Sequence, residues 1–134
     1  MPEKKTIERA RRDKREGKAP STQAGEFVRE EIEHIREGKH GARSTKQAIA
    51  IGLSKARRAG VDLKPPRHGQ ASARTVKSAE RAYEAGHTAH NRTPSRMRSQ
   101  AASRALKRES KSAASHEALS KQAHNAAMRR RRRG

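Results

Sequence analysis

The sequence of 134 residues contains no cysteine and no tryptophan, and it has one phenylalanine and one tyrosine. The lack of cysteine excludes disulfide bonds and thiolate chemistry, which fits a reducing compartment. Large apolar residues are also scarce, because Leu, Ile, Val and Phe together number 13, whereas alanine alone accounts for 23 residues. Since alanine buries little apolar area, one compact core through the whole chain is not expected.

Long hydrophobic runs are absent as well. No apolar run approaches the roughly 20 residues that cross a bilayer, so we expect a soluble cytoplasmic protein. Positive charge is what the sequence has in excess: 34 Lys and Arg against 14 Asp and Glu give a net charge of +20. Residues 1–43 carry a net charge of +3 and residues 44–134 carry +17. This balance indicates a polyanionic partner, nucleic acid rather than a membrane, bound mainly by the second part.

Residues 21–66 hold the clearest helical patterns and predict a helical hairpin. The first helix ends at Gly38, a residue typical of a left-handed C-terminal cap, and Phe27 stands at the edge of its apolar face. That face consists of Ala24, Val28, Ile32 and Ile35. On the opposite side, an acidic stripe that would repel phosphate is formed by Glu26, Glu30, Glu33 and Glu37.

The second helix of the hairpin has clear start and stop signals. Ser44 and Gln47 have the spacing of a capping box, and Gly60 follows the last periodic residue. Gly52 and the alanines of its inner face would let the first helix approach closely. This inner face is predicted to consist of Ala48, Ile49, Gly52, Leu53, Ala56 and Ala59.

The flanking segments are poorer in apolar residues. Residues 1–20 are predicted to form a charged arm, helical or disordered, and residues 67–92 a linker with a helix near 73–85. Residues 93–134 are predicted to form a basic Ala/Ser/Arg-rich helical tail that ends in an arginine run. The predicted fold class is therefore all-α, a small helical hairpin with basic, partly disordered helical extensions.

A basic rim surrounds the second helix of the hairpin and is the main candidate binding site. A helix N-terminus already favours an anion, and consecutive arginines suit phosphate through their forked donors. The predicted nucleic-acid-binding residues are Lys39, His40, Arg43, Lys46, Lys55, Arg57, Arg58, Arg129, Arg130, Arg131, Arg132 and Arg133.

Catalysis and metal binding have little support in the sequence. Glu84, His87 and His90 could place ligands on one helical face, but Gly86 interrupts the turn and no fourth ligand follows. No nucleophile motif is present, and a chain with so small a core would not hold a triad in geometry. We therefore predict no enzymatic activity, no cofactor and no metal.

Residues 20–66, PSTQAGEFVREEIEHIREGKHGARSTKQAIAIGLSKARRAGVDLKPP, resemble a family of small basic bacterial proteins of unknown function, described at most as DNA-binding. The segment SAASHEALSKQA at 112–123 is similar to the C-terminal part of that family. The resemblance covers about half of the chain and implies a bacterial cytoplasmic origin, which argues against a nuclear import role for the arginine run. It supplies no binding residues.

These observations favour a non-enzymatic, largely sequence-independent DNA-binding protein of the nucleoid-associated type. Two aromatic residues are too few for base stacking, so phosphate contacts to duplex DNA fit better than recognition of single strands. Two alternatives stay open: an RNA-binding or ribosome-associated basic protein, and an oligomerising protein-interaction module that forms a homo-oligomer.

Overall fold

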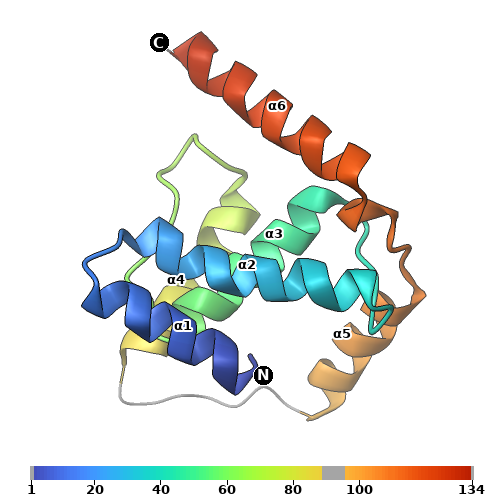
Figure 1. Cartoon of the computed structure of the whole chain (residues 1–134), viewed down its shortest axis with the longest axis horizontal. Coiled ribbons are helices and arrows are strands. Elements are labelled where there is room, and N and C mark those ends of the chain that lie inside the picture. Colours follow the sequence, from blue (N-terminus) through green and yellow to red (C-terminus); the bar gives the residue numbers. More distant parts are fainter. Residues whose placement is uncertain (1, 89–95, 134) are drawn as a thin grey trace. The chain divides into compact units, whose positions relative to one another are not determined.

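The computed structural model describes residues 2–88 and 96–133, and every regular element in these ranges is helical. The prediction of an all-α fold is confirmed. None of the helices in the described residues is long and apolar enough to cross a membrane. In chain order the elements are α1 (Lys4–Arg15), α2 (Pro20–Arg36), α3 (Thr45–Arg58), α4 (Ala73–His87), α5 (Arg96–Arg108), the 3-10 helix η1 (Ser112–Ala114) and α6 (His116–Arg133) (Figure 1).

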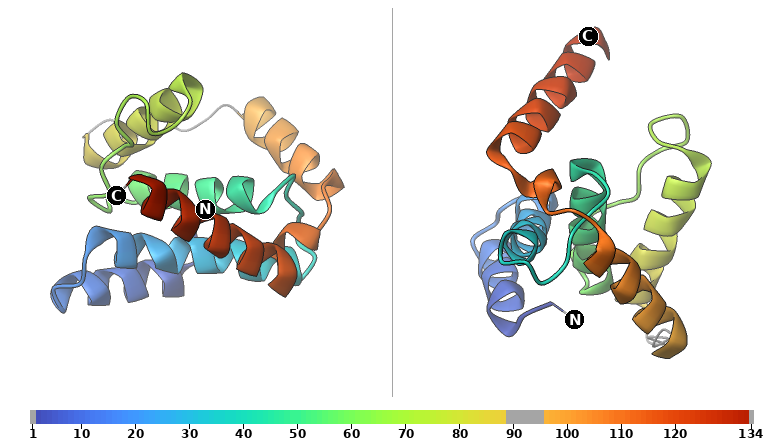
Figure 2. Two further views of the ribbon diagram at one scale, coloured as in Figure 1. Left: turned by 90° about the horizontal axis from the view of Figure 1, so that it is seen from above. Right: turned by 90° about the vertical axis from the view of Figure 1, so that its right-hand side faces the viewer.

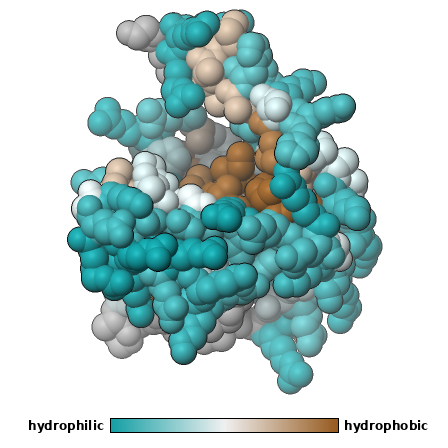
Figure 3. All heavy atoms as spheres, in the orientation of Figure 1, coloured by the Kyte–Doolittle hydropathy of each residue, from teal (hydrophilic) through white to brown (hydrophobic). Residues whose placement is uncertain are grey.

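The chain divides into two compact units. Unit 1 comprises Met1–Glu30 and Ala50–Thr93, and unit 2 comprises Glu31–Ile49 and Pro94–Gly134. Helices α2 and α3 each contribute residues to both units, so the predicted hairpin supplies a part of either core. The face of the molecule drawn in Figure 3 is hydrophilic over most of its area, as expected from the scarcity of large apolar residues.

The core of unit 1 joins α1, α2 and the second half of α3. Phe27 is only 1% exposed, although the sequence pattern placed it at the edge of the apolar face. The reason is α1, which lies alongside the first part of α2 (Figures 1 and 2) and brings Ile7 and Ala10 into the same core as Phe27. The buried members of this core are Ala10, Ala24, Phe27, Ala56 and Val61, and the partly buried Ile7, Leu53 and Leu63 pack against them.

The acidic stripe predicted on α2 is wrong at Glu30. This side chain is buried at 3% exposure because α1 packs over it. Its Oε1 accepts hydrogen bonds from the Glu3 backbone N–H at 2.6 Å and from the Thr6 hydroxyl at 3.1 Å. Glu30 therefore holds the start of α1 on α2 instead of facing solvent. Ala59, predicted on the inner face of α3, is exposed.

Small residues bring the elements of unit 1 into close contact, as the sequence predicted for α3. A Cβ atom on Gly52 would lie 2.6 Å from the Val28 Cα atom, so the backbones of α2 and α3 approach closely there. Gly86 near the end of α4 lies as close to the backbone of α3, since its added Cβ would fall 1.8 Å from the Arg57 carbonyl oxygen.

The core of unit 2 consists of Ile35, Ala42, Ala48, Ala113 and Ala114, with Ile32 packed against it. Polar side chains hold the backbone around η1. Arg36 Nε donates to the Ala114 carbonyl at 3.0 Å, and the Thr45 hydroxyl donates to the Ala113 carbonyl at 2.6 Å. Helix α5 has no buried residue, and α6 is capped by the preceding Ser115, whose hydroxyl accepts the Ala118 N–H at 3.1 Å.

Candidate nucleic-acid interface

The loop between α2 and α3, residues 37–44, is fixed by its backbone. Gly41 donates its N–H to the Leu106 carbonyl at 2.8 Å, and Ala42 donates to the Ser110 carbonyl at 2.9 Å. An added Cβ on Gly41 would lie 1.9 Å from the Glu109 carbonyl oxygen, so only glycine fits this position. The basic residues of the loop are therefore presented on a backbone that is anchored to the end of α5.

The start of α3 has the predicted Ser44 cap, and the return bond from Gln47 goes to Arg43, one residue before the cap. The Gln47 N–H donates to the Ser44 hydroxyl at 3.1 Å, and the Gln47 side chain accepts the Arg43 N–H at 2.6 Å. Since these donors are satisfied within the protein, fewer backbone N–H groups remain for an anion than the sequence suggested. Arg43 and Lys46 are exposed beside this helix start, three residues apart.

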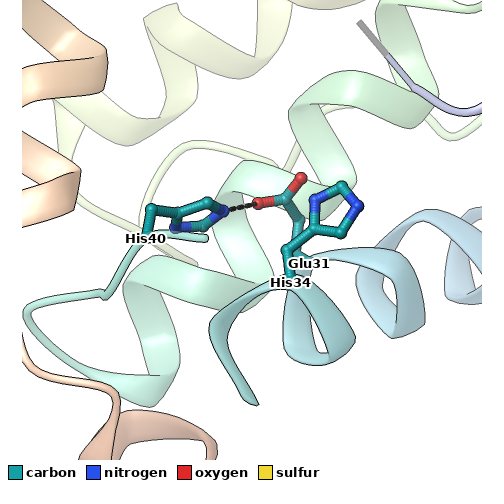
Figure 4. A group of neighbouring side chains, drawn as sticks. All are labelled: Glu31, His34 and His40. Atoms are coloured by element: carbon teal, nitrogen blue, oxygen red, sulfur yellow. Dashed lines mark ion pairs between the residues drawn. The ribbon is translucent and has the colours of Figure 1, made fainter. Parts of the chain in front are cut away.

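Lys39 and His40 both have acidic neighbours. The exposed Lys39 ammonium lies 3.2 Å from the Glu37 carboxylate, an arrangement that leaves it accessible to a phosphate. His40 is different, because its side chain is 15% exposed and its Nε2 atom lies 3.2 Å from the fully buried Glu31 carboxylate (Figure 4). The prediction that His40 contacts phosphate is therefore not supported by its position.

Arg57 is also placed for a structural role. It is 7% exposed, and its Nε and Nη2 atoms donate to the Leu63 and Lys64 carbonyls at 3.0 and 3.3 Å. Burial lowers the pKa of the Arg57 guanidinium from its ordinary value, although arginine stays charged at any physiological pH. The Arg57 side chain therefore holds the segment that follows α3 in place, and we withdraw Arg57 from the predicted binding residues.

The remaining predicted residues of α3 stay on the surface of unit 1. Arg58 is exposed and Lys55 is half-buried. Their spacing of three residues places them on one side of the helix. They belong to unit 1, whereas Lys39, Arg43 and Lys46 belong to unit 2.

The arginine run forms the last turn of α6. Arg129 to Arg132 are exposed, whereas the side chain of Arg133 lies outside the described part of the chain. Four consecutive helical residues point in different directions around the axis, so these arginines surround the helix end instead of forming one face. Cations at a helix C-terminus also interact favourably with the helix dipole, which helps a run of like charges to remain helical.

A basic stripe on α5 was missed by the sequence analysis. Arg104, Lys107 and Arg108 are exposed and follow one another at steps of three and one. Residues at positions i, i+3 and i+4 share a helical face, so these three charges project together. The spacing was visible in the sequence, but the low apolar content of the segment gave no indication of which face would be free.

Comparisons with family models, with curated proteins and with solved structures found no match for this chain. The family resemblance described above therefore stays a prediction.

Proposed function

We propose that this chain is a non-enzymatic DNA-binding protein that contacts duplex phosphates with little sequence preference. The observation that supports it best is the contrast between its cationic and its aromatic side chains. Basic residues are exposed at the start of α3, along α5 and at the end of α6, whereas both aromatic residues already have partners within the protein.

The engagement of the aromatic residues argues against base stacking. Phe27 is buried in the core of unit 1. The ring of Tyr83 stacks on the His87 ring with centroids 4.0 Å apart, and its hydroxyl donates to the Asp62 carboxylate. Binders of single strands rely on exposed aromatic rings, while binding to a duplex backbone requires cations alone. The arrangement therefore favours a duplex over a single strand.

The charge distribution favours residues 96–133 of unit 2 as the main contact. Residues 96–133 carry twelve basic and two acidic side chains. Phosphate contacts of this kind fix position on the duplex without reading bases, so similar affinities for unrelated sequences are expected. If about 5–8 phosphates are neutralised, the logarithm of the affinity falls against the logarithm of salt concentration with a slope of about −4 to −7.

A competition titration tests the proposal. The protein is bound to a labelled DNA duplex and displaced by unrelated DNA duplexes, an RNA duplex or a single strand, at several salt concentrations. Equal displacement by all DNA duplexes and the steep salt slope are the expected results. A preference for the RNA duplex would replace the proposal by RNA binding or ribosome association. A shallow slope together with self-association in sedimentation without nucleic acid would indicate the oligomerising module instead.

A further inference from the structure

Three side chains in unit 2 gather metal-ligating atoms in a small space. One ligand atom from each of Glu31, His34 and His40 lies within 4.8 Å of the other two. Figure 4 shows the Glu31 carboxylate between the two imidazole rings, with Glu31 and His34 on α2 and His40 on the loop that follows. The two ring centroids are 6.2 Å apart with an angle of 84° between the ring planes, so the rings do not stack on each other.

The fold builds this cluster from a single helix end. Glu31 and His34 are three residues apart on α2 and share a face. Gly38 has a φ of +79°, its N–H donates to the Ile35 carbonyl, and the Lys39 N–H donates to the His34 carbonyl, both at 3.0 Å. These two hydrogen bonds form a Schellman motif, which reverses the chain and returns His40 to the helix.

The tautomer of His40 is set by the backbone. Its Nδ1 atom lies 2.9 Å from the Gly41 carbonyl oxygen, which can only accept, so Nδ1 carries the proton and donates. In a neutral ring the Nε2 lone pair then faces the Glu31 carboxylate, 3.2 Å away. Two electron-rich atoms at this distance repel each other unless a cation lies between them or Nε2 is also protonated.

The surroundings of the cluster resemble those of a metal site. The Glu31 side chain is fully buried, at 0% exposure, and His40 is 15% exposed, so these two side chains are held in place by the fold. A histidine that ligates a metal through one nitrogen commonly donates its other N–H to a backbone carbonyl, as His40 does to Gly41. The Gly41 carbonyl is itself well positioned, because its residue is anchored to the end of α5.

We propose that Glu31, His34 and His40 form a binding site for a divalent transition metal ion of the Zn²⁺ class. Two imidazoles and one carboxylate are the ligands that Zn²⁺ and Co²⁺ prefer, whereas Mg²⁺ and Ca²⁺ prefer oxygen alone. Tetrahedral ligands at about 2.0–2.1 Å from the metal are about 3.3 Å apart, close to the spacing between Glu31 and His40. A fourth ligand position would remain for water or for a group from a partner.

This site departs from the sequence-based prediction of no metal, which considered another cluster. In that cluster His87 instead faces the Tyr83 carbonyl oxygen, 2.8 Å from its Nδ1, and His90 lies outside the described residues. The Glu31 site was missed because Glu31 and His34 belong to neither face predicted for the first helix, and His40 was assigned to nucleic-acid binding. The proposal does not depend on DNA binding.

Titration of the untagged full-length chain with Co²⁺, followed by displacement with Zn²⁺, tests the site. We expect one tight site with the strong visible absorption of tetrahedral Co²⁺, unaffected by excess Mg²⁺. His34→Gln and His40→Gln should each weaken Zn²⁺ binding more than about 100-fold, since losing even an outer partner commonly costs 10–100-fold. His124→Gln, an exposed residue of α6, is the matched control and should bind as the wild type does.

A second measurement needs no variant and so holds even if the substitutions impair folding. Side-chain ¹⁵N spectra of the wild-type histidines should show Zn²⁺ shifting the Nε2 resonance of His40 and one nitrogen of His34, with the other five rings unchanged. Failure of Zn²⁺ to shift these two rings, or equal shifts of all rings, would overturn the proposal. Equal weakening by His124→Gln would do the same, and Glu31 and His40 would then form a protonated ion pair only.

Discussion

The contact between α2 and α3 can be tested by making one substitution at two glycines, with opposite expected effects. A Cβ at Gly52 would lie 2.6 Å from the Val28 Cα and 2.9 Å from the Val28 N and Cγ2 atoms. Carbon atoms pack best at about 3.5–4.0 Å, so the two helices would have to separate by about 1 Å at this point. Because two of the three contacts are to backbone atoms, no change of rotamer relieves them.

Gly25, one turn before Val28 on α2, is the matched control. Nothing lies within 4 Å of an added Cβ there, and its φ is not positive. Gly25→Ala should therefore stabilise the protein by about 0.5–1 kcal/mol through helix propensity alone. Gly52→Ala gains the same propensity but incurs an overpacking cost of about 2–3 kcal/mol, so we expect a net loss of about 1–2 kcal/mol.

Urea unfolding followed by circular dichroism at 222 nm measures both variants. Chelator in the buffer keeps metal binding from contributing to the free energy of unfolding. The slope of the unfolding free energy against urea concentration should be the same for both variants. The difference of about 2–3 kcal/mol in unfolding free energy then shifts the urea concentration at the transition midpoint. If Gly52→Ala proves as stable as Gly25→Ala, the inference that the backbones of α2 and α3 are in contact at Gly52 is refuted.

Three further predictions separate structural from exposed charges. Arg57→Ala should lower the free energy of unfolding by about 1–3 kcal/mol, because the Leu63 and Lys64 carbonyls lose their charged donor, whereas Arg58→Ala should weaken DNA binding and leave unfolding unchanged; urea and DNA titrations of both variants check this. The hydrogen bond to Asp62 raises the pKa of Tyr83, the single tyrosine, so its ultraviolet titration should move to lower pH in Asp62→Asn, and an unmoved midpoint would contradict the contact. Deleting residues 129–134 should weaken binding to every duplex by a similar factor and flatten the salt slope by about one for each lost phosphate contact, whereas an unchanged slope would limit the arginine run to solubility.

The hairpin was predictable because its signals are local. The cap at Ser44 and the stop at Gly38 depend on residues a few positions apart, and each appears in the structure as expected. The close approach at Gly52 followed from the periodicity of small residues on one helical face. Local patterns of this kind carry their own physical cause, which is why a single sequence is sufficient to predict them.

The position of α1 could not be predicted, because its sequence is almost entirely charged. Its buried face consists of Thr6, Ala10 and Asp13, none of which resembles a core position. Thr6 is buried by its hydrogen bond to Glu30 and Ala10 by packing in the core of unit 1, and Thr6 and Glu30 are more than twenty residues apart. A polar contact between residues so far apart in the sequence produces no helical periodicity in either segment.

The candidate site was predictable in its charge and not in its membership. Net charge indicates a region of the chain, but residue type does not distinguish Arg57 and His40 from the basic residues that are exposed. Their roles depend on contacts with the backbone carbonyls of Leu63 and Gly41. Every residue has a backbone carbonyl, so the sequence does not reveal these partners. The sequence alone therefore does not separate a basic side chain that stabilises the fold, such as Arg57, from one that is exposed, such as Arg58.

This division of labour limits how far net charge can predict affinity. Arg36 and Arg57 each donate to backbone carbonyls, and Lys18 lies 3.4 Å from the buried Asp13 carboxylate. In a chain with so few large apolar residues, such contacts replace part of the missing hydrophobic core, and the buried Arg57 is also held away from a ligand. Only cations that reach phosphate release counterions, so the salt slope counts contacts and not charges. A slope of about −4 to −7 from a chain of charge +20 is therefore the expected result of a fold that uses its arginines for both purposes.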